Sequence, residues 1–360
     1  MKKYIYLIIT TLLSLILGVF YIDAFRSVDH TINSIGRLVL LILLLILGVL
    51  ITVFIYDLGH LLFTKIARYK VVSYKLLNAE ISKVDGKTKL RYYPMKDHEN
   101  KIVIASENEN PHYITYYLGG VYTNLIIASI LALIIMFIND GNFIKLLLIT
   151  FGLTNVISAF ANVLPLSFLY NDGYYLYNIM KDPVAVQAFH KSNSLIYKIV
   201  NGKNLDELNF TEYKIDNLNN DYNDPLILDL KEIETYYYLY RFQFKETMDT
   251  IDYVFKKSNH MLALYYKAFT NLKIVTLLLQ DKNDEALNIY LSLSQKHKNY
   301  ISKCKTIDDA LAALAMHLLI EKDKEKAKHD YNKCMEFVQN TPYIGEKEPF
   351  KDLIDLILNK

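Results

Sequence analysis

The sequence predicts a mainly α-helical protein, in which a membrane domain of about four spans precedes a cytosolic domain of repeated helices. Two observations predict this fold class. Apolar residues make up 52% of the 360 residues and crowd into the first half of the chain, in runs long enough to cross a bilayer. The second half is more polar and shows three similar helix–turn–helix patterns, spaced about 40 residues apart.

Net charge and cysteine content argue against several classes of partner and site. The formal net charge is +2, so no strongly electrostatic partner such as nucleic acid is indicated. The two cysteines, Cys304 and Cys334, lie far from any cluster of histidines and cysteines. They are interpreted as reduced thiols rather than as a disulfide or a zinc knuckle. The partner that the composition does indicate is the lipid bilayer.

Four segments follow from the changes in composition. Residues 1–36 hold an apolar run behind two lysines, which predicts an N-terminal transmembrane helix and loop with a cytosolic N-terminus. Residues 37–180 are expected to form the membrane core, and residues 181–225 a polar linker. Residues 226–360 resemble tetratricopeptide-type helical repeats, with an irregular helical bundle as the alternative.

The second apolar run begins after Arg37, continues without a charge to Tyr56 and keeps helical character to Ala67. The basic residues that follow mark the cytosolic face, and they are Lys65, Arg68, Lys70 and Lys75. Counting crossings from a cytosolic N-terminus puts the ends of the second and fourth spans on this same face. The sequence therefore predicts a multi-pass protein of the cytoplasmic membrane, with its N-terminus and C-terminal domain in the cytosol.

Between the second and third spans, the segment from Val71 to Tyr93 is rich in β-branched and aromatic residues. It surrounds the pair Asp85-Gly86, and this pattern predicts a small β-hairpin. The third span is expected at residues 113–138 and the fourth at residues 143–169.

Ionisable side chains at the end of the second span predict a functional site. Asp57 and His60 lie there, and Asp172 follows the fourth span. Such groups are costly inside a membrane and usually have a function. Taken singly, His60 could reach the membrane interface and Asp172 could belong to a turn. Because the topology brings both to one membrane face, we expect them to share a site.

Three motifs, in this order, resemble the site-2 protease family of intramembrane zinc metalloproteases over residues 37–180. Tyr56-Asp57-Leu58-Gly59-His60 resembles the zinc helix H-E-x-x-H, and Gly119-Gly120-Val121-Tyr122-Thr123-Asn124 resembles G-G-P-x-x-N. Asn162-Val163-Leu164-Pro165, followed by Asn171-Asp172-Gly173, resembles N-x-x-P…D-G. The resemblance implies a polytopic helical core with a metal site. It also implies packing or substrate-contacting roles for Gly119, Gly120, Asn124, Asn162 and Pro165.

The resemblance implies that His60 and Asp172 are metal ligands, and that Asp57 stands where the family has its general-base glutamate. Tyr56 stands where the family has its first histidine ligand. A phenol is protonated at neutral pH and ligates zinc poorly. Aspartate is one methylene shorter than glutamate, and misplacement on this scale is costly in catalysis. Zinc is the cofactor that the resemblance implies, and the missing ligand argues against its binding.

The expected function is therefore that of a bacterial membrane metallopeptidase homologue, a pseudoprotease with impaired or absent proteolysis. It would bind or regulate a membrane-associated or leader peptide, because the best-matching branch resembles proteases encoded beside bacterial modified-peptide export systems. Two alternatives stay open. One is an active intramembrane zinc metalloendopeptidase with unusual ligation. The other is a membrane-tethered helical scaffold for protein interaction.

Overall fold

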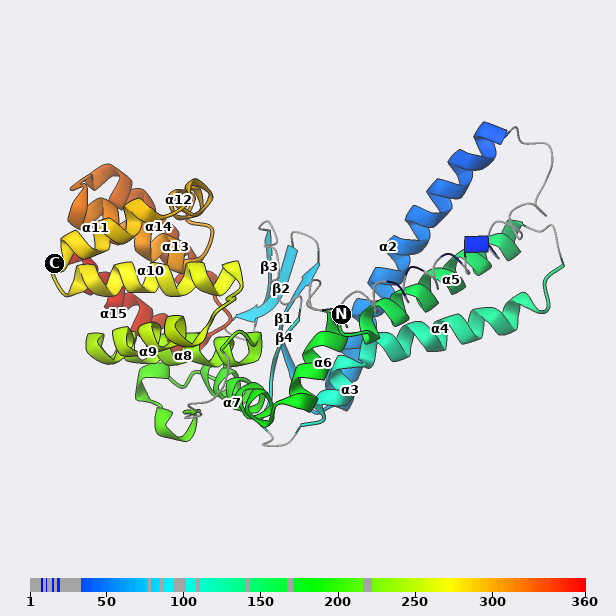
Figure 1. The fold of residues 1–360 in the computed structure, drawn as a ribbon, viewed down its shortest axis with the longest axis horizontal. Coiled ribbons are helices and arrows are strands. Elements are labelled where there is room, and N and C mark those ends of the chain that lie inside the picture. The colour runs from blue at the N-terminus through cyan, green and yellow to red at the C-terminus, as the bar shows by residue number, and fades with distance from the viewer. Residues whose placement is uncertain are drawn as a thin grey trace. The chain divides into compact units, whose positions relative to one another are not determined.

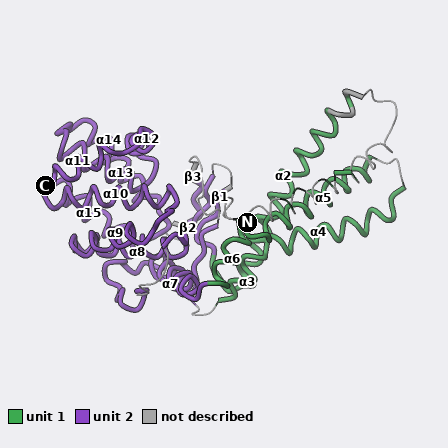
Figure 2. Tube along the Cα trace, in the orientation of Figure 1, with its two compact units in different colours: residues 1–70, 111–181 green, residues 71–110, 182–360 purple. Residues whose placement is uncertain are grey.

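A computed structural model describes residues 8, 11, 15, 18, 19, 34–76, 79–84, 87–92, 102–107, 111–139, 143–166, 171–215 and 222–360. The chain is mainly helical and carries a small antiparallel sheet, as the sequence predicts (Figure 1). It divides into two compact units (Figure 2). Unit 1 comprises residues 1–70 and 111–181, and unit 2 comprises residues 71–110 and 182–360.

Unit 1 is built from apolar helices. The helices described in it are α2 (Ser34–Ile66), α3 (Tyr113–Tyr117), α4 (Gly119–Ile135), α5 (Phe143–Val163) and α6 (Asp172–Lys181). Among the described residues, two segments are long and apolar enough to cross a membrane, Val39–Ile66 and Phe143–Val163. Helix α4 is also apolar but has only 17 residues, which is at the lower limit for a spanning helix.

The predicted spans differ from these helices in three ways. The first predicted span lies almost wholly outside the described residues. The third is divided at Leu118 into α3 and α4, where two consecutive glycines of low helix propensity follow. The fourth ends at Val163 instead of continuing to residue 169, before Pro165. Proline disfavours helical backbone at the residue before it, so α5 stops there.

Helix α2 ends where Arg68 adopts a left-handed backbone conformation, with φ of 66°. The amide N–H of Tyr69 then donates to the carbonyl of Thr64 over 3.0 Å, which closes the last turn. Farther back along the helix, Gly48 lets α2 approach α5 closely. A Cβ at Gly48 would lie 3.2 Å from the methyl groups of both Thr150 and Thr154.

Unit 2 contains a four-stranded sheet in the order β3-β2-β1-β4. Its strands are β1 (Lys70–Leu76), β2 (Ala79–Val84), β3 (Lys87–Tyr92) and β4 (Ile102–Ala105). The predicted hairpin is present in the pairing of β2 with β3, where Val84 stands opposite Lys87. The turn pair Asp85-Gly86 lies outside the described residues. The sheet is larger than the hairpin because β1 pairs with β2 and β4 lies beyond β1.

The rest of unit 2 is helical, and its core is continuous. Its helices are α7 (Pro183–Val200), η1 (Leu205–Glu207), η2 (Phe210–Glu212), α8 (Pro225–Tyr240), α9 (Phe244–Lys257), α10 (Ala263–Leu279), α11 (Asn283–Ser292), α12 (Gln295–Ser302), α13 (Ile307–Ala315), η3 (Met316–Ile320), α14 (Lys324–Asn340), η4 (Ile344–Glu346) and α15 (Lys347–Leu358). Part of the segment expected as a linker, residues 181–225, is helical here. Leu195 and Ile199 of α7 are fully buried in the core.

The three helix–turn–helix patterns correspond to three junctions of one kind. Phe242, Asp281 and Lys322 have φ of 56°, 60° and 56°, and each lies between two helical elements. A left-handed residue at this place reverses the chain and lets backbone N–H groups reach the last carbonyls of the preceding helix. Gln243 N, for example, donates to Tyr238 O over 2.9 Å. The junctions therefore form helical hairpins despite lacking glycine.

Burial raises the pKa values of several partly buried acids in unit 2, three of them by a large amount. Burial raises the pKa of Asp224 and of Asp229 from 3.8 to about 6, and that of Glu346 from 4.5 to about 7. A hydrogen bond from the hydroxyl of Tyr265 opposes the rise at Asp229. The folded chain therefore holds these protons more tightly than the unfolded chain. Their stabilising contribution is complete below the unfolded values and is lost as the pH rises through the folded values.

We expect the variant Glu346→Gln to flatten the fall in unfolding temperature between pH 4.5 and about 7. The glutamine keeps the shape of the protonated side chain but has no proton to lose. Circular dichroism on the detergent-solubilised full chain measures the temperature at several pH values. Asp355→Asn, at an exposed position on the following helix α15, is the control. An unchanged slope for Glu346→Gln contradicts the assignment.

Candidate functional site

Helix α2 presents Tyr56 and His60 on one side, because residues four apart share a helix face. His60 is 6% exposed and Asp57, between them in sequence, is 3% exposed. The rings of Tyr56 and His60 lie edge to face with centroids 4.8 Å apart. A hydrogen bond of 2.6 Å from the Thr64 hydroxyl to the His60 carbonyl supports the same turn. The sequence pattern thus positions two side chains of the candidate site on one rigid helix.

Asp172 is the first residue of α6, and Asn171 before it fixes where α6 begins relative to the end of α5. The Asn171 carboxamide donates to the carbonyls of Ala161 and Leu164, each over 2.6 Å. Its oxygen accepts from the backbone N–H groups of Leu166 and Tyr174, over 3.2 and 3.0 Å. All four hydrogen bonds of one side chain tie the end of α5 to the start of α6. Asp172 is therefore held in a defined position.

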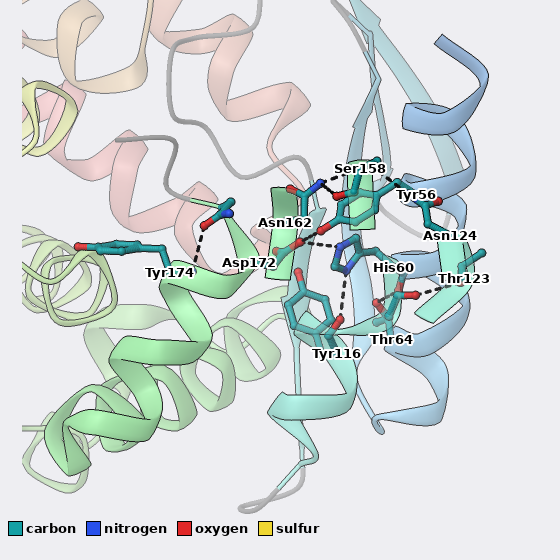
Figure 3. A network of polar contacts seen from close by, with 12 residues as sticks. Tyr56, His60, Thr64, Tyr116, Thr123, Asn124, Ser158, Asn162, Asp172 and Tyr174 are labelled. Atoms are coloured by element: carbon teal, nitrogen blue, oxygen red, sulfur yellow. Dashed lines mark hydrogen bonds and ion pairs between the residues drawn. The ribbon is translucent and has the colours of Figure 1, made fainter. Parts of the chain in front are cut away.

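The two helices meet at one carboxylate oxygen (Figure 3). The hydroxyl of Tyr56 donates to Asp172 Oδ2, and His60 Nε2 lies 3.0 Å from the same oxygen. The other ring nitrogen, Nδ1, lies 3.1 Å from the backbone carbonyl of Tyr116. A backbone carbonyl only accepts, so Nδ1 carries a proton, and Nε2 faces the carboxyl group. His60 and Asp172 form a charge-assisted pair to which Tyr56 adds a third member.

The glycine pair at the start of α4 leaves space for side chains of the neighbouring helix α2. A Cβ at Gly120 would lie 2.6 Å from the Tyr56 ring, and a Cβ at Gly119 would lie 2.5 Å from Cβ of Phe63. On the facing helix, a Cβ at Gly59 would lie 2.5 Å from the Thr123 hydroxyl. The glycines therefore permit α2 and α4 to approach closely, and Gly120 accommodates the tyrosine ring.

The other residues expected at the site serve the helix packing. Asn124 Nδ2 donates to Ser158 Oγ over 3.0 Å, and Asn162 Nδ2 donates to the Ser158 carbonyl over 2.9 Å (Figure 3). These bonds join α4 to α5 and stabilise α5 itself. Pro165 is partly buried just after α5. The structure thus brings Tyr56, His60 and Asp172 together, and it surrounds them with the asparagine and glycine residues of the motifs.

Sequence reasoning missed the contribution of Tyr116. Its backbone carbonyl orients His60, its ring centroid lies 5.7 Å from that of His60, and it contacts the rings of Tyr69 and Tyr117. A backbone acceptor leaves no signal in a sequence, so only the run of tyrosines in α3 could have drawn attention to it. Of the two histidines that precede α3 in the sequence, His112 is exposed and His98 lies outside the described residues.

The residues that meet here differ from a catalytic zinc site at one donor position. Three protein donors must leave a fourth position for water, and a phenol stands where the third donor would be. The Tyr56 hydroxyl and Nε2 of His60 both contact Oδ2 of Asp172. Within the residues that the structure describes, no group of three or more His, Cys, Asp or Glu side chains could hold a metal ion. The three side chains instead satisfy one another across α2 and α6.

Comparison with known proteins adds no relative to this description. No protein-family model, no curated protein and no solved structure matches the chain.

Proposed function

We propose that this chain is a site-2-protease-like membrane protein whose former catalytic centre has lost peptide hydrolysis, and that it binds or regulates a membrane-associated peptide. The contact of Tyr56 and His60 with one oxygen of Asp172 carries this proposal. Residues at the three positions that the resemblance assigns to metal ligands converge, which supports the kinship. Their mutual hydrogen bonds support the loss of the metal.

In this proposal unit 1 crosses the bacterial cytoplasmic membrane several times and unit 2 lies in the cytosol. Two observations support it. Helices α2 and α5 have the length and apolar character of membrane spans. Lys65 and Arg68 follow the apolar part of α2, and positive charge beside a span marks the cytosolic side.

A peptide-binding role is supported by exposure at the site and by the helical hairpins. The side chain of Asp172 is 21% exposed, so its carboxylate is accessible to a ligand. Helical-hairpin arrays commonly bind peptides along an extended surface. We expect a labelled apolar helix of about 20 residues to bind the full chain in lipid nanodiscs. Asp172→Asn should weaken that binding, because the amide disrupts the pair with His60. Binding that ignores the substitution favours the scaffold alternative.

Metal content tests the loss of hydrolysis. Purified full-length protein is expected to contain far less than one zinc ion per chain by mass spectrometry of the metal. His60→Ala and Asp172→Ala should leave that content unchanged, and a chelator should leave the unfolding temperature unchanged. Stoichiometric zinc in the parent that disappears in both variants overturns the proposal and favours the active zinc protease.

A further inference from the structure

One face of the four-stranded sheet in unit 2 is polar and is turned toward the helices. Residues that stand opposite each other on neighbouring antiparallel strands place their side chains on the same face. Ser73 stands opposite Ser82, and Ser82 stands opposite Lys89, so these three side chains share a face. Both serines are buried, and Nζ of Lys89 donates to the carbonyl of Gln339 on α14 over 3.2 Å. The polar face therefore lies toward the helical part of unit 2.

The opposite face of the sheet exposes apolar side chains. Tyr74, Ile81 and Leu90 stand opposite one another on β1, β2 and β3, each one residue along from the polar row. Successive side chains of a strand alternate between faces, so this row lies on the face away from α14. Leu90 is 73% exposed and Ile81 is 44% exposed. An antiparallel sheet commonly buries its apolar face and leaves its polar face in water, whereas here the two faces are exchanged.

Lysines accompany this row, which we call the outer sheet face. Lys83 follows Ile81 by two residues on β2, so its side chain is on the outer sheet face as well. Lys87 begins β3, and both lysines are exposed. A surface that combines exposed apolar side chains with lysines is complementary to a bilayer surface, where acyl chains meet anionic headgroups.

The connection to α2 keeps the sheet close to the bilayer. Strand β1 begins at Lys70, four residues after Ile66 ends α2. Four extended residues span at most about 14 Å, so the first strand starts near the membrane face at which the proposed span ends. This short connection favours the bilayer over a soluble protein as the occupant of the outer sheet face.

We infer that the outer sheet face rests on the cytosolic surface of the bilayer. Its apolar side chains enter the boundary with the acyl chains, and Lys83 and Lys87 contact anionic headgroups. The apolar area removed from water stabilises the contact, and the lysines add an attraction that salt screens. The inference rests on the proposed membrane crossing of unit 1 and adds a second contact with lipid, made by unit 2. Such a contact restricts how unit 2 can turn about its connections to the spans.

Single tryptophans test the inference, because the chain has none of its own. Leu90→Trp probes the outer sheet face, and Leu50→Trp probes an exposed position within α2. Leu291→Trp is a control at an equally exposed position on α11, which Figure 2 shows at the other end of unit 2 from β3. Each full-length variant is placed in nanodiscs of equal parts phosphatidylglycerol and phosphatidylcholine. The phosphatidylcholine is brominated near the headgroup or near the chain end, and bromine quenches tryptophan fluorescence on close contact.

We expect the quenching of Leu90→Trp to exceed that of Leu291→Trp several-fold and to be strongest with the shallow bromines. Leu50→Trp should be quenched most by the deep bromines. Quenching of Leu90→Trp no stronger than that of Leu291→Trp, beside strong quenching of Leu50→Trp, overturns the inference alone. Blue-shifted but unquenched emission of Leu90→Trp also overturns it, because protein then covers the face. Absence of quenching in Leu50→Trp contradicts the membrane crossing itself, and the inference with it.

Charge reversal tests the contact of the lysines with headgroups. Lys83→Glu with Lys87→Glu, combined with Leu90→Trp, should lower the quenching in the anionic nanodiscs and change it little in phosphatidylcholine alone. Lys296→Glu with Lys303→Glu, at exposed positions in the helical part of unit 2, makes the same change in net charge and is the control. We expect the control pair to keep the quenching of Leu90→Trp. An equal fall with both pairs, or a fall with neither, contradicts the headgroup contact.

Discussion

The double variant Tyr56→His with Asp57→Glu is expected to bind one zinc ion per chain, whereas the parent is expected to bind none stoichiometrically. The introduced imidazole removes the phenol that donates to Asp172 and supplies the missing nitrogen ligand. His60 already points Nε2 at that carboxylate, and its Nδ1 faces the Tyr116 carbonyl. An imidazole oriented through its second nitrogen is the usual arrangement of a zinc-bound histidine. The scaffold therefore needs one new donor, not a new geometry.

Metal analysis and thermal unfolding of this variant measure the gain. A ligand that binds only the folded state stabilises it by about 4 kcal/mol at a thousand times its Kd, so added zinc should raise the unfolding temperature by several degrees. A chelator should reverse the rise. Adding His60→Ala to the double variant is the control, because it removes a ligand again. Zinc binding that persists in this triple variant places the metal elsewhere and contradicts the predicted site.

Much of this site is predictable from the sequence because it rests on short-range rules. The apolar run of α2 is visible at once, and four-residue spacing puts Tyr56 and His60 on one face. The pair Asp172-Gly173 is recognisable in its motif. Their meeting agrees with the expectation that the ends of the second and fourth predicted spans share one face. The hairpin of β2 and β3 likewise follows from β-branched and aromatic residues on both sides of a turn pair.

The features that sequence reasoning missed depend on contacts between distant segments. Strand β4 joins the sheet from beyond the predicted hairpin, and α7 is folded into a core although its sequence resembles a linker. The Tyr116 group that orients His60 is a backbone carbonyl, which a residue of any type would supply. A pattern identifies residue types, whereas a hydrogen-bond balance requires coordinates.

The variant Gly173→Ala is expected to destroy the site without touching any of its polar side chains. A Cβ at this position would lie 2.3 Å from the carbonyl oxygen of Val163 and 2.9 Å from that of Asn162. Both are backbone atoms at the end of α5, so they cannot rotate away as a side chain could. Overpacking of this kind costs about 1–3 kcal/mol. The start of α6 must shift, and Asp172 with it.

Gly152→Ala is the matched control within α5. A Cβ there meets only Cβ of Leu131, at an ordinary 3.9 Å, and alanine favours a helix more than glycine does. We expect Gly152→Ala to keep or raise the unfolding temperature, and Gly173→Ala to lower it by several degrees. In the zinc-binding double variant, Gly173→Ala should also abolish metal binding. Equal behaviour of the two glycine variants would show that α6 is not held against α5 as described. Neither glycine supplies a metal ligand. A difference between the two variants therefore reports the position of Asp172 and not a change in its carboxylate.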